Sequence, residues 1–480
     1  MNLRLDLLAP ELVLGLALLA LFVQTILPRA KSAAGIMDGG WLAYVAVAAA
    51  VASAATLGLS GSVFYGAYQV DALSQFFKLI VSVGLAIATH NASFGGTPEL
   101  ASDKRADYYL FLALSGFGLM LLASSVELIT IIIALEISSF SLYALVPLRA
   151  EKPESAEAGI KYVMFGAVAT ALTLFGLAYI LAAHHTTYLP ALAGRDFGFT
   201  AAPLAALGLV LFAVGFFYKL ALFPFHFWAP DVYDGASNET AAYIATLPKL
   251  GAVVVLVRLA ALLGPSLEIA TALAVLGALS MTLGNLMALA QKDIKRLLGF
   301  SSVAHAGYIM IGLVAGTAEG LAAASYYALA YLVMNLAVFW VVCRAAPDGR
   351  NLMLDDLSGM HRRAPVLAFV LAVGAFSLVG LPPTAGFTGK LFLLSAAWGR
   401  GFDWLVIVAA VNTAISIFYY LSLVRYAYTS EPGEGGALLT RPAAWANAFG
   451  LLLATAVLAL GVLPGSMFSL AAAAGQQLLP

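Results

Sequence analysis

Long apolar runs alternate with short polar segments along almost the whole chain. Runs of about 20 apolar residues are long enough to cross a bilayer as helices. The pattern predicts about fourteen such spans, near residues 7–28, 41–60, 70–92, 107–124, 126–149, 157–183, 203–228, 240–263, 266–290, 298–316, 321–343, 363–399, 402–428 and 442–463. The first run, Leu7–Leu27, is too long for a signal peptide and predicts an uncleaved span. We therefore expect an all-α polytopic membrane protein.

The composition agrees with a chain that is solvated mainly by lipid. Of its 480 residues, 62% are hydrophobic and 10% are charged, whereas a soluble domain carries about 25% charged residues. The net charge of −1 gives no support for nucleic-acid binding. The single cysteine, Cys343, excludes an internal disulfide and an iron–sulfur cluster within the chain. No P-loop, dinucleotide fingerprint or metal-ligand spacing is present.

The basic residues lie mainly in one set of alternate loops. That set contains Arg29, Lys31, Lys104, Arg105, Arg149, Lys152, Lys292, Lys295, Arg296, Arg344, Arg350, Arg362, Arg363, Arg425 and Arg441. The opposite side carries Arg4, Arg195 and Arg400. Because cytoplasmic loops are enriched in Lys and Arg, the first set is expected to face the cytoplasm. An even number of spans then places both termini outside it.

Two halves of the chain have the same arrangement. Spans four to eight begin near Asp107 and spans nine to thirteen near Ser266, and Pro224 and Pro382 are 158 residues apart. Five is an odd number of spans, so the second block enters the membrane from the opposite face, as in the inverted repeats of transporters. Coincidence between two membrane prolines is the alternative. The repeat predicts four segments, residues 1–106, 107–265, 266–430 and 431–480.

Each block also contains a helix that proline interrupts inside an apolar run. Proline removes a backbone donor, which hydrocarbon cannot replace. We therefore expect broken helices near Leu222–Phe225 and Leu381–Thr388, with water beside each break. Methionine and aromatic residues within the spans are interpreted as packing or lipid-facing groups.

Five ionisable residues lie deep inside the spans and are the main candidates, because a charge there costs roughly 2.5–3.5 kcal/mol on insertion scales. They are Glu136, Lys219, Lys249, His305 and Lys390. Burial disfavours the charged form of such groups, so they can exchange protons near neutral pH. Their order along successive helices favours a proton relay across the molecule. Structural ion pairs, snorkelling lysines and a simple hydrogen bond from His305 are the alternatives.

Three further residues are secondary candidates: Lys78, Lys161 and His226. Lys78 follows Asp71 by seven residues and Lys161 follows Glu157 by four, so either lysine can instead form a local ion pair. His226 follows Lys219 by seven residues, although the intervening proline leaves the shared face uncertain.

Arg258 is the remaining basic residue within a span. It lies near the outer end of its apolar run. Long basic side chains at such positions extend to the interface, so Arg258 is expected to snorkel.

Several long motifs carry a family resemblance over essentially the whole chain. They are DYYLFLALSGFGLMLLASSVELITIIIALEISSFSLYALVPLRAEKPESAEAGIKYVMFGA, FYKLALFPFHFWAPDVYDGA, KDIKRLLGFSSVAHAGY and LVGLPPTAGFTGKLFLL. These stretches resemble subunit N of bacterial respiratory complex I, the proton-pumping NADH–quinone oxidoreductase. The opening LLAPELVLGLALLALF, the motif VDALSQFFKLI and the lysine at Lys390 favour subunit N over its larger antiporter-like siblings.

The resemblance implies fourteen helices with two inverted five-helix bundles, each holding a half-channel. It implies that Glu136 and Lys219 form a charged pair, that Lys249 is the central lysine, and that His305 leads towards Lys390 near the outward exit. It further implies that NADH, FMN, iron–sulfur clusters and quinone bind in partner subunits, and that this chain has no cofactor of its own. The expected partners are the other membrane subunits, and the expected location is a bacterial inner membrane with both termini periplasmic.

Two other functional classes stay open at this point. A subunit of a multi-subunit cation/proton antiporter shares the fold and the Glu–Lys pairing. A structural membrane subunit retains such charges without conducting protons.

Overall fold

The chain is almost wholly helical in the computed structural model, which describes residues 4–26, 39–95, 104–149, 152–263, 267–429 and 442–478. The long helices are α1 (Ala9–Ile26), α2 (Leu42–Ala55), α3 (Ala72–Gly95), α4 (Arg105–Ser124), α5 (Leu128–Leu145), α6 (Pro153–His184), α8 (Pro203–Leu220), α10 (Asn238–Leu263), α11 (Leu267–Leu289), α12 (Ile294–Val314), α13 (Ala318–Ala345), α15 (Pro365–Val379), α16 (Ala385–Ala397), α17 (Asp403–Thr429), α18 (Ala444–Val462) and α19 (Gly465–Leu478).

Short elements connect them. They are the helices α7 (Leu189–Leu192), α9 (Trp228–Gly235) and α14 (Met360–Arg363), the 3-10 turns Leu5–Leu8, Phe64–Gly66, Val146–Leu148 and Leu354–Leu357, and the strands β1 (Gly61–Val63) and β2 (Tyr68–Val70). Within the described residues, twelve helices are long and apolar enough to cross a membrane, and α2, α15 and α16 are shorter apolar helices. The expectation of a polytopic helical membrane protein is confirmed.

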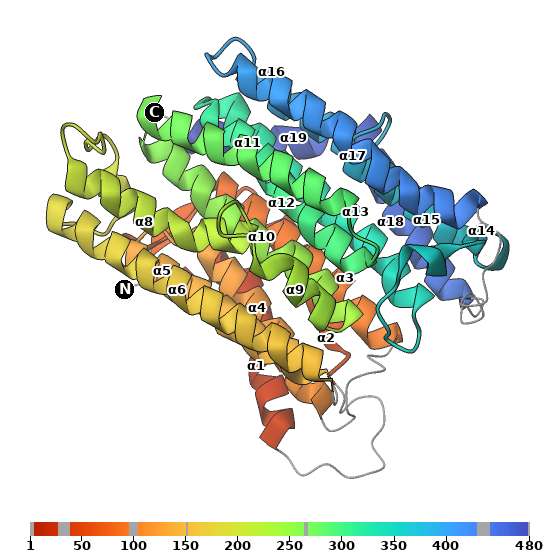
Figure 1. The fold of residues 1–480 in the computed structure, drawn as a ribbon. Helices are drawn as coiled ribbons and strands as arrows, with labels where there is room; N and C mark the ends of the chain where they lie inside the picture. Colours follow the sequence, from red (N-terminus) through yellow and green to blue (C-terminus); the bar gives the residue numbers. More distant parts are fainter. Residues whose placement is uncertain are drawn as a thin grey trace.

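Three helices form the centre of the molecule. The apolar stretches of α12 and α13 are wholly buried and that of α10 is 94% buried, whereas those of α6 and α18 are 28% buried. The remaining helices surround this core (Figure 1). A charged side chain on α10 or α12 is therefore surrounded by protein rather than lipid.

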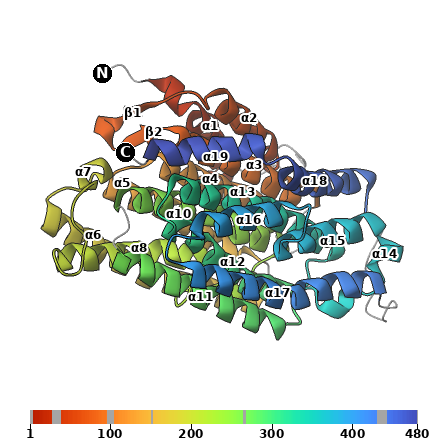
Figure 2. The same cartoon turned by 90° about the horizontal axis from the view of Figure 1, so that it is seen from above.

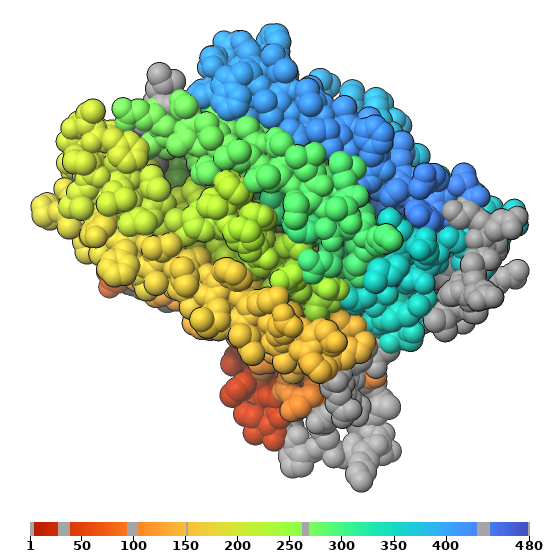
Figure 3. All heavy atoms as spheres, in the orientation of Figure 1, coloured from red at the N-terminus to blue at the C-terminus, as the bar shows by residue number. Residues whose placement is uncertain are grey.

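The outer helices present apolar side chains outwards. Figure 3 shows one face, on which α6, α8, α11 and α17 follow one another from yellow to blue. The exposed side chains of α6 include Ile160, Met164, Phe165, Val168 and Phe175. Continuous apolar surface of this kind is solvated by lipid or covered by other membrane subunits.

Both predicted helix breaks are present. α8 ends at Leu220 and α9 begins at Trp228, while α15 ends at Val379 and α16 begins at Ala385. The residue after each first half is left-handed, with φ of 60° at Ala221 and 91° at Gly380. The second break is shorter than predicted, because the helix resumes before Thr388.

The order of elements is the same in both proposed blocks. In each, three helices are followed by a broken helix and then one long helix: α4, α5, α6, α8–α9 and α10, and then α11, α12, α13, α15–α16 and α17. The inverted relation of the blocks and their exact boundaries stay predictions.

The second expected span is wrong in its C-terminal part. Helix α2 ends at Ala55, and an antiparallel hairpin follows in which β1 pairs with β2 from Gly61 opposite Val70. Gly61 and Gly66 both have positive φ, a conformation that glycine adopts at little steric cost. The apolar pattern does not reveal this turn because hydrophobic residues continue through it.

Helix α19 was not predicted. It follows Pro464 and packs against α13 and α3 through the small buried residues Ala471, Ala474 and Gly475 (Figure 2). Its run is shorter than a membrane span and contains polar residues, which is why a search for spans passes over it.

Helix α9, the continuation beyond the first break, is held by ion pairs. Asp231 accepts from Lys161 of α6 at 2.7 Å and from Arg296 of α12 at 2.8 Å. At the C-terminal end of α9, Arg149 donates to the carbonyls of residues 234–236. Cations at a helix C-terminus are favourable to its dipole. These contacts bind α9 to α6 and α12.

Gly386 is the closest backbone contact at the second break, and replacing it tests that packing. A Cβ there would lie 1.7 Å from the carbonyl oxygen of Ser377. We expect Gly386→Ala to lower thermal stability and assembly, because overpacking of this kind costs typically about 1–3 kcal/mol or more. Gly58→Ala is the control, since no atom lies within 4 Å of a Cβ at Gly58. Equal melting temperatures of the two variants would contradict the close packing of Gly386 against Ser377.

The ion pairs of Asp231 predict that the stability of α9 depends on pH. Partial burial raises its pKa, but the bonds from Lys161 and Arg296 lower it more, so the pKa lies below its usual value. A carboxyl with a lowered folded-state pKa stabilises the fold above its unfolded pKa of about 3.9 and loses that contribution as the pH falls through the folded value. Acidification, or Asp231→Asn at neutral pH, should therefore speed amide hydrogen exchange in α9. Exchange is measured after correction for intrinsic rates, with Asp196→Asn as the control. Unchanged α9 protection in Asp231→Asn would show that the ion pairs do not hold the helix.

Candidate functional site

Lys249 lies opposite the first helix break. Its Nζ donates to the carbonyl of Leu220, the last residue of α8, at 2.8 Å, and the side chain is buried. That carbonyl is free because the helix ends there and has no following turn to supply a donor. The C-terminal end of a helix carries partial negative charge, which stabilises an ammonium. The break thus provides the acceptor that Lys249 needs inside the membrane.

Lys390 has the same relation to the second break. Its Nζ donates to the carbonyl of Val379, the last residue of α15, at 2.9 Å, and lies 3.4 Å from that of Leu378. The ammonium also lies 4.2 Å from the ring centre of Tyr308, a favourable cation–π distance. Both buried lysines are therefore bound by main-chain oxygens rather than by carboxylates.

His305 lies between these two lysines on α12. Its Nδ1 is 2.6 Å from the hydroxyl of Tyr327, and its Nε2 is 3.0 Å from the hydroxyl of Tyr420. A neutral imidazole donates from one nitrogen and accepts at the other, so the two tyrosines form a hydrogen-bonded path through it.

Two further tyrosines connect His305 to the lysines. The ring of Tyr331 lies 5.2 Å from that of His305 and 5.6 Å from Lys249 Nζ. The ring of Tyr308 lies 6.0 Å from His305 and contacts Lys390. Tyr331 and Tyr308 thus link Lys249, His305 and Lys390 in series within the buried core.

Lys219 is buried within a cage of tyrosines at the start of this line. Its Nζ lies 5.4 Å from the ring of Tyr143, 5.3 Å from that of Tyr162 and 5.7 Å from that of Tyr218. Its nearest polar side-chain atom is the hydroxyl of Tyr162 at 3.5 Å. The next residue along the chain, Leu220, is the one whose carbonyl binds Lys249.

Glu136 is not in direct contact with Lys219. It is half-buried on α5, and its Oε1 accepts from Thr170 at 2.7 Å. Within the described residues no ion pair joins it to Lys219, although Tyr143, two turns along the same helix face, contacts the lysine. The charged pair that the resemblance implied is therefore not a closed salt bridge in this structure.

The structure places the secondary candidates Lys161 and His226 at the first break. Lys161 forms the expected pair with Glu157 at 2.8 Å as well as the bond to Asp231. His226 is buried within the break between the rings of Phe223 and Phe227, and its Nδ1 has no hydrogen-bond partner in the described part of the chain.

The local pair of Lys78 with Asp71, which was one alternative, is not formed, and the expectation that Arg258 snorkels is wrong. Lys78 pairs with Glu11 of α1 at 2.7 Å rather than with Asp71. Asp71 pairs instead with Arg258 at 2.7 Å, so Arg258 is buried between helices and does not snorkel. Sequence spacing considers partners on the same helix, and both pairs are formed between helices.

The tyrosines are the residues that the sequence reasoning missed. Aromatic residues in the spans were interpreted as packing groups, but seven of them touch the lysines or His305: Tyr143, Tyr162, Tyr218, Tyr308, Tyr327, Tyr331 and Tyr420. The adjacency of Tyr218 to Lys219 and the three-residue step from His305 to Tyr308 were available signals.

Comparison with known proteins assigns the family. The family model described as NADH:quinone oxidoreductase/Mrp antiporter, TM matches residues 125–416. The chain is 59% identical over 476 residues to NADH-quinone oxidoreductase subunit N 2 of Solidesulfovibrio magneticus, covering 98% of this chain and 99% of the relative. It is 36% identical to F420H2 dehydrogenase subunit N of Methanosarcina mazei, with coverage of 98% and 99%.

Solved structures have the same fold. A chain of respiratory complex I from Thermus thermophilus with bound aureothin superposes with a TM-score of 0.83 at 34% identity, covering 96% of this chain and 99% of that one. A chain of the Mrp complex from Dietzia sp. superposes with a TM-score of 0.86 at 21% identity, covering 99% and 98%. This chain belongs to the NADH:quinone oxidoreductase/Mrp antiporter family of membrane subunits, and within it to the subunit N group.

Proposed function

We propose that this chain is a proton-translocating membrane subunit of an NADH–quinone oxidoreductase. In this role, a relay of Glu136, Lys219, Lys249, His305 and Lys390 couples electron transfer from NADH to quinone to the pumping of protons. The support is the family, together with a series of buried ionisable groups. Burying such groups in a membrane costs free energy, so their presence there indicates a function.

One observation carries the proposal. Lys249 and Lys390 each bind the carbonyl end of a broken helix, and His305 lies between them with a tyrosine on either side. A carbonyl stabilises an ammonium through its dipole but does not neutralise it. The protonation of each lysine therefore depends on the charges around it, as a relay requires.

The positions of Lys219 and Lys249 suggest how proton transfer in the relay is driven. Lys249 binds the carbonyl of Leu220, the residue after Lys219, and two neighbouring cations repel, so in this proposal a proton on one lysine disfavours a proton on the other. A change in the distance from Glu136 to Lys219 alters the field at Lys249. Charge displacement is thereby converted into proton uptake or release.

The redox steps belong to other subunits in this proposal. NADH, FMN, iron–sulfur clusters and quinone bind in partner subunits, and this chain performs no electron transfer itself. Relatives named for NADH and for F420H2 align over nearly their whole length, which supports oxidation of the donor elsewhere. Among the described residues no group of three or more His, Cys, Asp and Glu is placed to hold a metal ion.

The proposal also includes location and partners. The chain lies in a bacterial inner membrane with about fourteen spans, two inverted five-helix repeats and both termini on the periplasmic side. Its partners are antiporter-like siblings, small membrane subunits and lipid. The basic residues of one set of loops support this orientation.

A cation/proton antiporter subunit is the second candidate. The likeness to the Mrp complex chain favours it, but at 21% identity that likeness concerns the fold alone. A non-conducting structural subunit is the third. Gene neighbours separate the antiporter from the oxidoreductase, and the variants below separate both conducting proteins from a structural one.

Lys249→Arg is the main test. It keeps the positive charge, but guanidinium does not release its proton at accessible pH, so we expect proton translocation to fall. Translocation and NADH oxidation are measured in vesicles containing the assembled complex, with the exposed Lys292→Arg as the control. Wild-type proton stoichiometry in Lys249→Arg would reduce Lys249 to a fixed charge and refute the relay.

Glu136 and Lys219 are tested by removing one charge at a time. Glu136→Ala or Lys219→Ala should lower proton pumping and coupled turnover in complexes that still assemble. An unpaired buried charge can cost about 3–5 kcal/mol, so assembly is checked by native electrophoresis. Glu136→Gln is the sharper variant because it keeps an oxygen for Thr170 and removes only the charge. Normal pumping by assembled Glu136→Gln would exclude Glu136 from the relay.

A further inference from the structure

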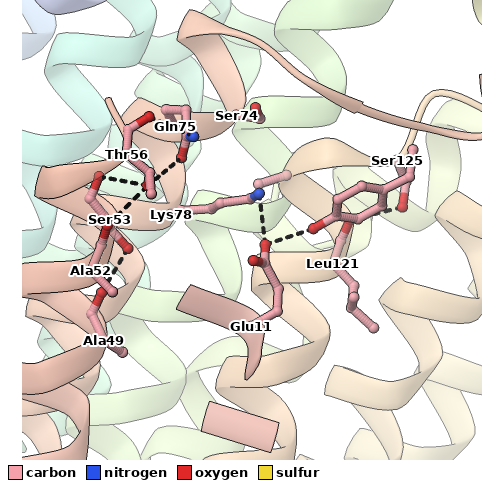
Figure 4. A network of polar contacts seen from close by, with 12 residues as sticks. Glu11, Ala49, Ala52, Ser53, Thr56, Ser74, Gln75, Lys78, Leu121 and Ser125 are labelled. Atoms are coloured by element: carbon pink, nitrogen blue, oxygen red, sulfur yellow. Dashed lines mark hydrogen bonds and ion pairs between the residues drawn. The ribbon is translucent and has the colours of Figure 1, made fainter. Parts of the chain in front are cut away.

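A second cluster of buried polar groups lies in the N-terminal segment, on α1, α3 and the hairpin. Lys78 Nζ is 2.7 Å from Glu11 Oε1, and the hydroxyl of Tyr68 donates to the same oxygen at 2.6 Å. The ammonium lies 5.1 Å from the ring centre of Tyr68. Figure 4 shows Lys78 reaching Glu11, while Gln75 of the same helix bonds Thr56, the residue that follows α2. The side chains of Lys78 and Glu11 are 0% and 5% exposed.

The hydrogen bonding of this cluster is uneven. Oε1 of Glu11 accepts from Tyr68 and lies 2.7 Å from the ammonium of Lys78, whereas Oε2 of Glu11 and Nζ of Lys78 have no hydrogen-bond partner among the described residues. An ammonium has three donors, and the contact of Lys78 with Glu11 is an ion pair rather than an aligned hydrogen bond. Buried polar groups are normally satisfied, so the open positions indicate a place for water or for a transferable proton.

An open cavity at the hairpin lies beside this cluster and is lined by neighbours of its residues. It has a volume of ≈ 710 Å³, and its lining includes Ser60, Gln69, Asp71, Arg258 and Gln477. Asp71 lies directly before α3, seven residues ahead of Lys78, and Gln69 follows Tyr68 in β2. The ion pair of Asp71 with Arg258 forms the polar floor between the cavity and the buried pair.

The cluster is separate from the central line of lysines. Between α3 and the core helices, Gly84 is packed by Leu247 of α10 and Leu332 of α13. Lys249 donates to the carbonyl of Leu220 at the end of α8. Within the described residues no hydrogen bond or ion pair connects Lys78 or Glu11 to Lys249, so the two groups are not in direct contact.

We propose that Glu11, Lys78 and Tyr68 form a second proton-exchange site, which communicates with the aqueous side through the cavity at the hairpin. A proton moves from Lys78 Nζ to Glu11 Oε1, leaving a neutral amine and a carboxylic acid. Nζ then takes up a proton from hydronium that enters past Asp71, and the carboxylic acid of Glu11 gives its proton to water at the open oxygen, which restores the ion pair. The charged groups that face the site are Asp71 on its own helix and Arg258 on α10. The inference rests on the proposed function, since it adds a site to a proton-translocating subunit.

A purely structural ion pair is the competing explanation, and two variants distinguish it from a proton-exchange site. Lys78→Arg keeps the charge and a bond to Glu11 but does not release a proton. Tyr68→Phe keeps the ion pair and the ring and removes only the hydroxyl. We expect both variants, in the assembled complex in vesicles, to translocate fewer protons per NADH oxidised. The exposed Arg4→Lys, near the same end of α1, is the control.

A second measurement does not depend on pumping. Infrared difference spectra recorded over a pH titration should show the carbonyl band of a protonated buried carboxyl. The band should shift in D2O and disappear in Glu11→Gln. Its midpoint should move in Lys78→Met, even where that variant fails to pump.

The outcomes are distinguishable. Wild-type stoichiometry in both Lys78→Arg and Tyr68→Phe, or no band that depends on Glu11, overturns this inference. If Lys249→Arg lowers pumping in the same preparation while the Lys78 and Tyr68 variants do not, the proposed function survives and only the second site is lost. Normal pumping by Lys249→Arg would reject the proposed function instead.

Discussion

A cation inside a membrane protein needs an acceptor, and here the acceptors come from broken helices. Ending α8 at Leu220 and α15 at Val379 leaves carbonyls without donors, and Lys249 and Lys390 supply those donors. Each half of this arrangement is unfavourable alone, because hydrocarbon satisfies neither a free carbonyl nor an ammonium. Together they are stable, and the position of the two lysines follows from the position of the two breaks.

The tyrosines complete the environment of these charges. A tyrosine presents a ring face that attracts a cation and a hydroxyl that donates and accepts hydrogen bonds. Tyr308 uses its ring for Lys390, while Tyr327 and Tyr420 use their hydroxyls for His305. The same residue type therefore holds charge and connects groups without introducing a carboxylate that would neutralise the lysines.

The sequence predicted the features that residues of a single helix determine, and it missed those that depend on contacts between elements. The breaks were predicted because Pro224 and Pro382 act on their own helices. The partners of Lys78 and Arg258 were not predicted, since Glu11 on α1 and Asp71 just before α3 reach them from other elements. The hairpin was hidden by hydrophobic residues that continue through the turn, and α19 by a length below that of a span. The two tyrosines that hydrogen-bond His305 lie on α13 and α17, so no spacing within one helix reveals them.

The two kinds of buried lysine differ in what their protonation responds to. Lys249 is bound to a carbonyl, so losing its proton changes the net charge of the site, and the balance shifts with every charge near it, including Lys219 and Glu136. Lys78 is bound to Glu11, so a proton shifted between them leaves the net charge unchanged and distant charges have little influence on the balance. Access of water to the pair then controls exchange. In the proposed function, a group of the first kind would transmit an electrostatic signal through the membrane, whereas a group of the second kind would respond to the access of water.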